Sequence, residues 1–238
     1  HALLDFYPQA LAVYDVDGFW PLLYVVMAAS VPLRRHGSSM GHGRPRIVSH
    51  HVVEYLIQQE PLALLQTTRN ERRAIPLHLA VENPFLTVEL LDLLLQVFPE
   101  TIYYQDGGGR LPIECAISAS DELDLSAIRR LIEAAPVLLS FVSDGSLLLH
   151  RYLDGLESTD EEVDIEAIHQ STPSILRAAN ILEAVVQACP SALRIQESTT
   201  LCTPLVQACD DDIAVPCIYT LLRAWPEQVT TQKHLIFA

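Results

Sequence analysis

The pentapeptide Gly37 to Gly41 matches the Gly-x-Ser-x-Gly motif that carries the nucleophile of many serine hydrolases. That chemistry requires Ser39 on a sharp turn between a parallel strand and a helix, with an aspartate and a histidine supplied from elsewhere. The preceding residues, Val31 to Arg35, contain a proline and two arginines, which do not fit a buried strand. We therefore interpret the match as a chance occurrence in a loop, and we do not expect the chain to be an enzyme.

Four histidines near Ser39 are the candidates for metal ligation: His36, His42, His50 and His51. Structural zinc sites use closely spaced pairs, such as Cys-x2-Cys or His-x3–5-His. Here the spacing is His-x5-His-x7-His-His and no cysteine accompanies the histidines, so they indicate a solvated loop. A hydrolase or metal-dependent module centred on residues 36–51 is kept as a minor alternative, and we predict no metal and no cofactor.

Two further short runs could suggest ligand binding. Asp210 to Asp212 resembles a cation site, but it directly precedes Ile213, where acidic residues favour the start of a helix. Gly107 to Gly109 lacks the spacing of a phosphate-binding loop. We predict that these glycines form a loop tip with positive φ.

Composition narrows the class of protein. The 238 residues include 15 Lys and Arg against 30 Asp and Glu, a net charge of −15, which argues against nucleic acid as a ligand. Hydrophobic residues make up 50% of the chain, enough for an ordered core. The longest uncharged run, Gly18 to Leu33, contains Pro21 and Pro32 and is too short for a membrane span, so it indicates a buried helix.

The five cysteines form no Cys-x-x-Cys motif and their number is odd. Most of them lie in or beside apolar stretches that are predicted to be helical. Buried, reduced thiols of this kind are typical of intracellular proteins. We therefore expect a cytoplasmic or nuclear location, with an organelle interior left open.

The elements that must carry any site follow from an internal repeat. Six prolines occupy the same place in this repeat: Pro8, Pro61, Pro99, Pro136, Pro190 and Pro226. Two aliphatic residues stand five and four positions before each proline, and a further aliphatic residue stands three positions after it. This spacing predicts a long amphipathic helix that ends just before each proline. Twelve predicted core positions follow from it: Leu56, Leu94, Leu95, Leu131, Ile132, Val185, Leu221 and Leu222 on the helices, and Leu64, Ile102, Leu139 and Leu193 in the outgoing loops.

A second marker opens a short helix before each long one, often with proline at its first position. The segments Arg73 to Ala80 and Gly109 to Ala116 read RAIPLHLA and GRLPIECA, and they resemble the G-x-T-P-L-H-x-A signature of ankyrin repeats. Residues 15–18 and 105–109 resemble the Asp/Asn-Gly tip of that family's hairpin fingers. No unit has both the threonine and the histidine of the signature, so the family's Thr–His hydrogen bond is not expected.

The resemblance implies an all-α fold: an α-solenoid of about five stacked ankyrin-like helix pairs, with projecting loops. It covers residues 1–238 as a single array, and because the chain begins inside a helix pattern we expect a fragment of a longer array or chain. Two units are about 18 residues longer than the others, which predicts two long inter-helix insertions, at about 30–47 and 153–170. A helical repeat of another kind, TPR- or HEAT-like, stays open as an alternative.

The two insertions carry opposite charge. The first is rich in Gly and Ser and contains the basic residues Arg34, Arg35, Arg44 and Arg46. The second is acidic throughout and includes Asp160, Glu161 and Glu162. Charge blocks of this kind often act as interaction segments, although they can also serve only to keep a loop solvated.

A solenoid offers an extended open surface rather than a closed catalytic pocket. We therefore expect a protein–protein interaction scaffold or adaptor that binds other proteins across a concave repeat surface, with self-association as a further possibility. The alternative is a structural subunit of a larger assembly. Besides the charged residues of the insertions, the predicted binding residues are large side chains on the expected fingers and loops: Tyr14, Phe19, Tyr103, Arg110 and Arg194. The three aromatic residues among them could instead pack between adjacent fingers.

Overall fold

A computed structural model describes residues 13–28, 50–118, 124–156 and 173–228, apart from 17, 85, 141, 144 and 145. Two compact units make up the chain, His1–Ala127 and Ile128–Ala238, and each is described by itself. The described residues are mostly helical and contain almost no strand, which confirms the predicted all-α class.

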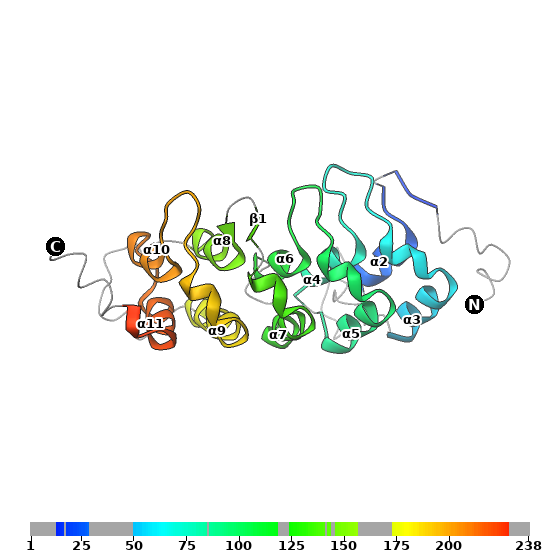
Figure 1. The fold of residues 1–238 in the computed structure, drawn as a ribbon. Coiled ribbons are helices and arrows are strands. Elements are labelled where there is room, and N and C mark those ends of the chain that lie inside the picture. Colours follow the sequence, from blue (N-terminus) through cyan, green and yellow to red (C-terminus); the bar gives the residue numbers. More distant parts are fainter. Residues whose placement is uncertain are drawn as a thin grey trace, which may run out of the picture. The chain divides into compact units, whose positions relative to one another are not determined.

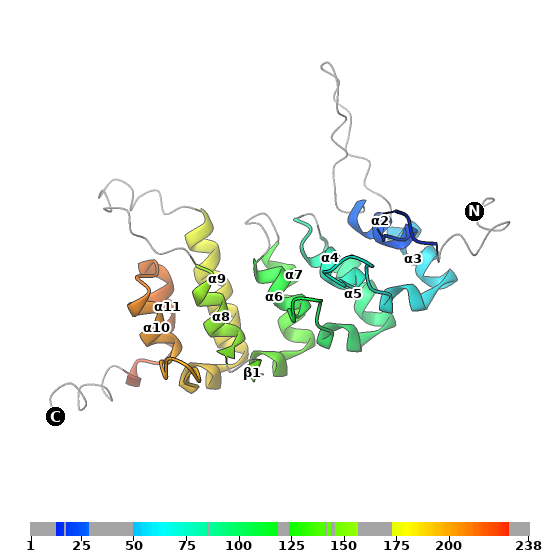
Figure 2. The ribbon, with the colours of Figure 1, turned by 90° about the horizontal axis from the view of Figure 1, so that it is seen from above.

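Unit 1 alternates short and long helices, separated by 3-10 turns. Its elements are α2 (Pro21–Ala28), α3 (His50–Gln59), η2 (Pro61–Leu65), α4 (Pro76–Val81), α5 (Val88–Val97), η3 (Pro99–Tyr103) and α6 (Pro112–Ser118). Helix α4 packs against both α2 and α6, while α3 packs on α2 and α5 packs on α4. Figures 1 and 2 show the short helices α2, α4 and α6 in one row and α3 and α5 beside it.

Unit 2 continues the same alternation. Its elements are the larger part of α7 (Leu125–Ala134), η4 (Pro136–Ser140), β1 (Val142–Ser143), β2 (Ser146–Leu147), α8 (Leu148–Asp154), α9 (Pro173–Ala188), η6 (Pro190–Arg194), α10 (Pro204–Asp210) and α11 (Val215–Ala224). The short helix α8 packs on α10, and the long helices α9 and α11 pack together. Strands β1 and β2 form a small antiparallel pair in which Val142 faces Leu147.

The prolines mark the helix ends as predicted. Each long helix in the two units stops two residues before its proline, and the residue between them takes one repeated backbone conformation. Glu60, Phe98, Cys189 and Trp225 all have φ between −137° and −141° and ψ between 72° and 84°. This conformation is not helical, in keeping with the steric restriction on residues that precede proline. Four of these prolines then open 3-10 turns, where the sequence predicted only a loop: Pro61, Pro99, Pro136 and Pro190.

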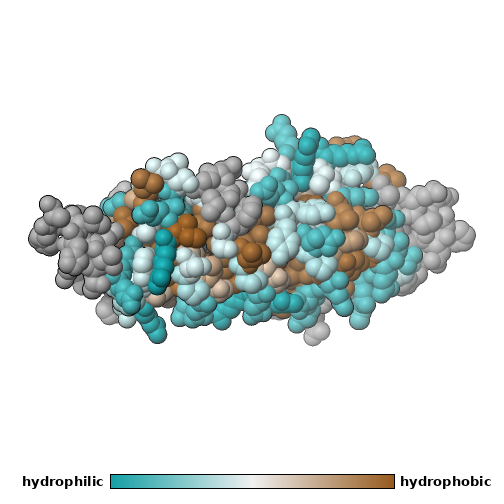
Figure 3. Space-filling model, viewed as in Figure 1, coloured by the Kyte–Doolittle hydropathy of each residue, from teal (hydrophilic) through white to brown (hydrophobic). Residues whose placement is uncertain are grey.

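The core follows the repeat. Eleven of the twelve predicted core positions are buried, including the loop anchors Leu64, Ile102, Leu139 and Leu193. Leu222 differs, because it is only half-buried next to the fully buried Leu221. In the space-filling view of Figure 3, hydrophilic side chains cover the lower edge of unit 1, along α3 and α5.

Two boundaries differ from the sequence prediction. Leu153 and Asp154 were assigned to the second insertion, but they are the last two residues of α8, and Leu153 is fully buried. Helix α2 was expected to be buried, but it exposes Tyr24 and Met27. Both insertions otherwise lie largely outside the described residues, and within the described part no helix is long and apolar enough to cross a membrane.

Candidate protein-binding surface

Four loops that precede short helices share one hydrogen-bonding pattern, and we call them fingers 1 to 4 (residues 15–19, 68–74, 106–110 and 197–202). In each finger the backbone N–H of the first residue donates to the carbonyl two residues before the helix-opening proline, at 2.8–3.0 Å. The pairs are Asp15 with Phe19, Thr68 with Ala74, Asp106 with Arg110, and Glu197 with Cys202. The fingers therefore start and end at equivalent positions of the repeat, although they enclose different numbers of residues.

A positive φ recurs three residues before each of these prolines. The angles are 79° at Gly18, 44° at Arg73, 76° at Gly109 and 57° at Leu201. Glycine adopts this conformation freely, whereas a side chain makes it unfavourable. Fingers 2 and 4 thus hold a strained non-glycine residue where fingers 1 and 3 have glycine.

The strain at Leu201 predicts a stabilising substitution. Leu201 is 67% exposed, so Leu201→Gly removes little packing and relieves the backbone conformation. We expect the free energy of unfolding of unit 2 to rise by about 0.5–1 kcal/mol, as measured by denaturant titration. The control Gln196→Gly, at an exposed position without positive φ, should lower it; an equal effect of both changes would contradict the account.

The three fingers of unit 1 bond to one another. Arg69 N–H donates to the Gly18 carbonyl at 3.4 Å, and Gly107 N–H donates to the Arg72 carbonyl at 2.5 Å. A Cβ at Gly107 would lie only 2.2 Å from the carbonyl oxygen of Glu71. Figure 1 shows the loops of unit 1 standing side by side above α2, α4 and α6. Glycine at 107 is therefore required by the close approach of fingers 2 and 3.

Gly107→Ala is expected to lower the free energy of unfolding of unit 1 by about 1–3 kcal/mol, because the new methyl group meets backbone atoms. Gly108→Ala provides the matched control, since its Cβ would meet nothing closer than 3.3 Å, a side-chain oxygen of Asp106. Denaturant titrations of both variants check the prediction. A cost for Gly108→Ala as large as that for Gly107→Ala would show that finger contact is not the cause.

Finger 3 is built around the buried carboxylate of Asp106. Asp106 accepts hydrogen bonds from the backbone N–H groups of Gly108 and Arg110, both at 2.9 Å, and from the Arg110 side chain at 2.9 and 3.2 Å. Burial by itself raises the pKa of Asp106, but these hydrogen bonds and the charge of Arg110 outweigh it and lower the pKa below its usual value. Arg110 is thus held within its own finger.

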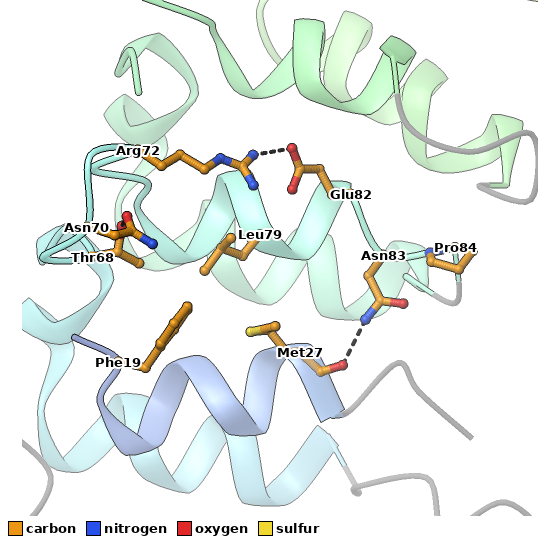
Figure 4. Close-up of a pocket in the computed structure, with 9 residues that line it drawn as sticks. All are labelled: Phe19, Met27, Thr68, Asn70, Arg72, Leu79, Glu82, Asn83 and Pro84. Atoms are coloured by element: carbon orange, nitrogen blue, oxygen red, sulfur yellow. Dashed lines mark hydrogen bonds and ion pairs between the residues drawn. The ribbon is translucent and has the colours of Figure 1, made fainter. Parts of the chain in front are cut away.

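A groove lies between α2 and α4, bounded on one side by finger 2 (Figure 4). Its volume is about 410 Å³. Its lining consists of four apolar residues, Phe19, Met27, Leu79 and Pro84, and five polar ones, Thr68, Asn70, Arg72, Glu82 and Asn83. Figure 4 shows Phe19 and Met27 facing Leu79 on α4, and Arg72, which comes from finger 2, reaching Glu82 at the end of α4.

The polar groups of the groove are largely paired with one another. Arg72 forms an ion pair with Glu82, and the Asn83 side chain donates to the Met27 carbonyl at 2.8 Å. The Thr68 hydroxyl donates to Asn70 at 2.7 Å. The groove therefore has a fixed polar rim and leaves its apolar residues as the surface that a ligand would cover.

Aromatic side chains border the groove at finger 1. The Phe19 and Tyr24 rings lie 5.8 Å apart, and Tyr24, which is 48% exposed, donates its hydroxyl to Asp15. The Tyr14 ring meets Trp20 edge-on at 5.4 Å and carries the Arg69 guanidinium 3.9 Å above its face. Tyr14 is therefore packed between fingers 1 and 2, whereas Phe19 and Tyr24 border the open surface.

The predicted binding residues do not form a single site. Phe19 lines the groove, Tyr14 packs between fingers 1 and 2, and Arg110 is bonded to Asp106. Tyr103 is 48% exposed at the end of η3, and Arg194 in unit 2 lies 5.4 Å from the Trp225 ring. The charged candidates of the insertions lie outside the described residues: Arg34, Arg35, Arg44, Arg46, Asp160, Glu161 and Glu162.

The remaining candidate residues from the sequence are Ser39, the nearby histidines and the cysteines. Ser39, His36 and His42 lie outside them, and the described His, Cys, Asp and Glu side chains contain no group of three that could hold a metal ion. Cys115 and Cys217 are buried, and burial raises the pKa of each thiol to about 11. Cys209 is exposed, which differs from the expectation of buried thiols.

The two histidines of the repeat signature occupy equivalent places. His78 Nε2 lies 3.0 Å from the Arg110 carbonyl, and His150 Nε2 lies 3.2 Å from the Cys202 carbonyl, in each case the next finger of the same unit. The Nδ1 atom of both rings is buried and has no hydrogen-bond partner among the described residues. Both histidines therefore connect neighbouring repeats and are not exposed to a ligand.

Asp210 to Asp212 were predicted to cap the helix that follows them, and this was wrong. Asp210 is the last residue of α10, Asp211 is its C-cap, and Asp212 has a φ of 50°. Helix α11 begins at Val215 with Ala214 as its N-cap, and no side chain caps it. Pro216 is the second residue of α11. Proline fits this uncapped start because it lacks a backbone N–H at a position where the helix would leave that N–H unpaired.

Sequence reasoning did not identify Met27, Leu79 or Asn83 as lining residues. The available signal for Met27 and Leu79 was their position on the short helices α2 and α4, and Asn83 lies just after α4. No known protein-family model matches the chain, and no curated protein sequence matches it. A function for the chain must therefore be proposed from the geometry of its described residues.

Proposed function

We propose that this chain is a protein–protein interaction scaffold or adaptor that binds a partner through the fingers and groove of unit 1. The groove is the observation that carries the proposal. It combines an apolar surface, formed by Phe19, Met27 and Leu79, with a rim of paired polar groups. Protein interfaces have the same arrangement, with an apolar centre and a polar edge, and aromatic residues such as Phe19 and Tyr24 are enriched in them.

The repeats that present this groove are proposed to be ankyrin-like and to form a solenoid. The shared closure of the fingers, the positive φ before each helix-opening proline and the two histidine contacts to the next finger support this assignment. The first two features recur in all four fingers, and the histidine contacts join neighbouring repeats, which is how a solenoid is stabilised.

Binding rather than catalysis is supported by the chemistry of the groove. Its two ionisable side chains, Arg72 and Glu82, are bonded to each other. The described lining contains a threonine hydroxyl but neither a histidine nor a cysteine beside it. A nucleophile needs a neighbouring base to become reactive, so this lining is better suited to contact than to chemistry.

The proposal is tested by selecting binders from a displayed library of random 12-residue peptides against the full chain. Dissociation constants of the selected peptides are then measured by fluorescence anisotropy for wild type and for Leu79→Arg, which places a charge in the groove. We expect at least a tenfold loss of affinity, because the arginine both fills the apolar surface and cannot be desolvated there.

Leu62→Arg is the matched control. Leu62 is 59% exposed on η2 and does not line the groove, so this variant should bind the peptides as wild type does. Circular dichroism of both variants shows that the fold is kept. Peptides that bind Leu79→Arg as tightly as wild type would refute the groove as the binding surface.

A further inference from the structure

Helix α11 in unit 2 carries a row of apolar residues that stay partly exposed. Val215, Ile218, Tyr219 and Leu222 follow one another at the spacing of one helix face, and we call them the α11 stripe. Val215 is 77% exposed and Tyr219 is 62% exposed, while the other two are half-buried. Leu221, by contrast, is fully buried on the helix that packs against α9 and α10 (Figure 1). The stripe is therefore an apolar face separate from the core face of α11.

Two positions of the stripe are buried in every earlier long helix. Ile218 and Leu222 stand eight and four residues before Pro226, and the equivalent aliphatic residues of α3, α5, α7 and α9 are at most 7% exposed. These residues are Val53, Leu91, Ile128 and Leu182 at the first position, and Ile57, Leu95, Ile132 and Val186 at the second. Val186 borders a hollow that residues of α9 and α11 line together. The stripe thus has the residue types of a face that a long helix presents to another helix.

Tyr219 differs from the repeat and enlarges this apolar face. Seven residues before their prolines, the four earlier long helices hold charged residues: Glu54, Asp92, Arg129 and Glu183. Charged side chains are rarely covered by protein, whereas large aromatic residues are enriched at interfaces. The change to tyrosine favours a contact that the earlier helices do not make at this position.

The α11 stripe is complementary to itself. Its four residues are placed symmetrically about a point midway between Ile218 and Tyr219. If two α11 helices pack antiparallel about this point, each Ile218 lies at the level of Tyr219 in the other copy, and each Val215 lies at the level of Leu222. Both copies would then cover the same apolar surface with the same surface.

The charges at the two ends of α11 fit the same arrangement. Asp211 is exposed in the turn before the helix, and Arg223 is exposed in its last turn, where it lines the hollow together with Tyr219. Neither Asp211 nor Arg223 forms an ion pair with a described residue. Antiparallel packing brings Arg223 of one copy to the level of Ala214 in the other, a few residues from Asp211. It also sets the two helix dipoles in opposite directions, so that unlike ends meet.

We propose that two copies of this chain pair through the α11 stripe, with their α11 helices antiparallel. Each copy contributes the same surface, so the contact closes at two copies. The net charge of −15 on each chain opposes association in general, but charges farther apart than about 8 Å are largely screened at physiological salt. The stripe lies in unit 2, so this proposal does not depend on the groove of unit 1.

Sedimentation velocity of the full chain at physiological salt, over a hundredfold range of concentration, tests the proposal. We expect the mean mass to rise from that of one copy towards that of two, and no further. Tyr219→Glu places a charge at the centre of the contact and should raise the dimer dissociation constant by about tenfold or more. The matched control is Tyr103→Glu, because Tyr103 is also exposed but lies in unit 1, and it should leave the constant nearly unchanged. Circular dichroism shows that both variants keep the fold.

An exchange of charges tests the antiparallel arrangement. Arg223→Asp and Asp211→Arg should each weaken the dimer by about threefold or more, since like charges then meet at both ends of the contact. The double variant should regain most of the lost affinity, because opposite charges meet again. A wild type that stays a single copy, a mass that rises beyond two copies, or equal dimer affinities of Tyr219→Glu and Tyr103→Glu would overturn the proposal. A double variant that dimerises no more tightly than the single ones would do the same.

Discussion

Leu221→Ala is expected to lower the free energy of unfolding of unit 2 by about 2–5 kcal/mol. Leu221 is fully buried on α11, the helix that packs against α9, and truncation would leave a cavity that the closely packed helices cannot fill. The effect is measured by denaturant titration followed by circular dichroism.

The neighbouring Leu222 supplies the control for this prediction. It is the same residue type on the same helix, but it is only half-buried. Leu222→Ala should therefore cost about 1 kcal/mol, since it removes less buried surface and leaves no closed cavity. Equal costs at the two positions would contradict the packing described for α11.

Asp106→Ala is expected to destabilise unit 1 by about 3 kcal/mol, because it leaves two finger N–H groups and the Arg110 guanidinium without their acceptor. Asp15→Ala, at the equivalent position of finger 1, should cost about 1 kcal/mol, since Asp15 is exposed to water whereas Asp106 is buried. Denaturant titration at pH 7 compares the two variants.

The same prediction has a pH signature. The pKa of Asp106 is lower in the folded chain than in an unfolded one, so the unfolded state binds the proton more readily. The stabilisation is therefore complete above the unfolded value of about 3.9 and is lost as the pH falls through the folded value. Wild type and Asp106→Ala should converge in stability at low pH; a difference that stays constant down to pH 2 would show that ionisation of Asp106 is not the source.

Helix boundaries and core positions could be predicted because they depend on local rules. Proline cannot continue a helix, and the aliphatic pairs before Pro99 or Pro136 recur on one helix face, so these positions were correct. Leu222 was misplaced because the repeat fixes the direction of a side chain but not how much of it a neighbouring helix covers. On α11, Leu221 is fully buried, whereas Leu222 beside it is only half-buried.

The candidate surfaces could be predicted only in part. Phe19 was identified as an exposed aromatic residue, but the groove also depends on Leu79 and Asn83, which come from the next repeat and meet it only in the folded unit. Tyr14 and Arg110 were chosen for their residue type, and the structure shows partners that were not evident from spacing: Trp20 and Arg69 for Tyr14, and Asp106 for Arg110. Contacts between repeats are what sequence periodicity leaves unspecified.

The most direct test of the groove uses its single methionine. The chain has two methionines, Met27 in the groove and Met40, so a sample with 13C-labelled methionine methyl groups gives two NMR signals that Met40→Leu assigns. Adding a selected peptide at saturating concentration is expected to shift the Met27 signal in wild type, and to leave it in place in Leu79→Arg. A peptide that binds wild type with full affinity while the Met27 signal does not move would contradict the proposal that the groove of unit 1 is where partners bind.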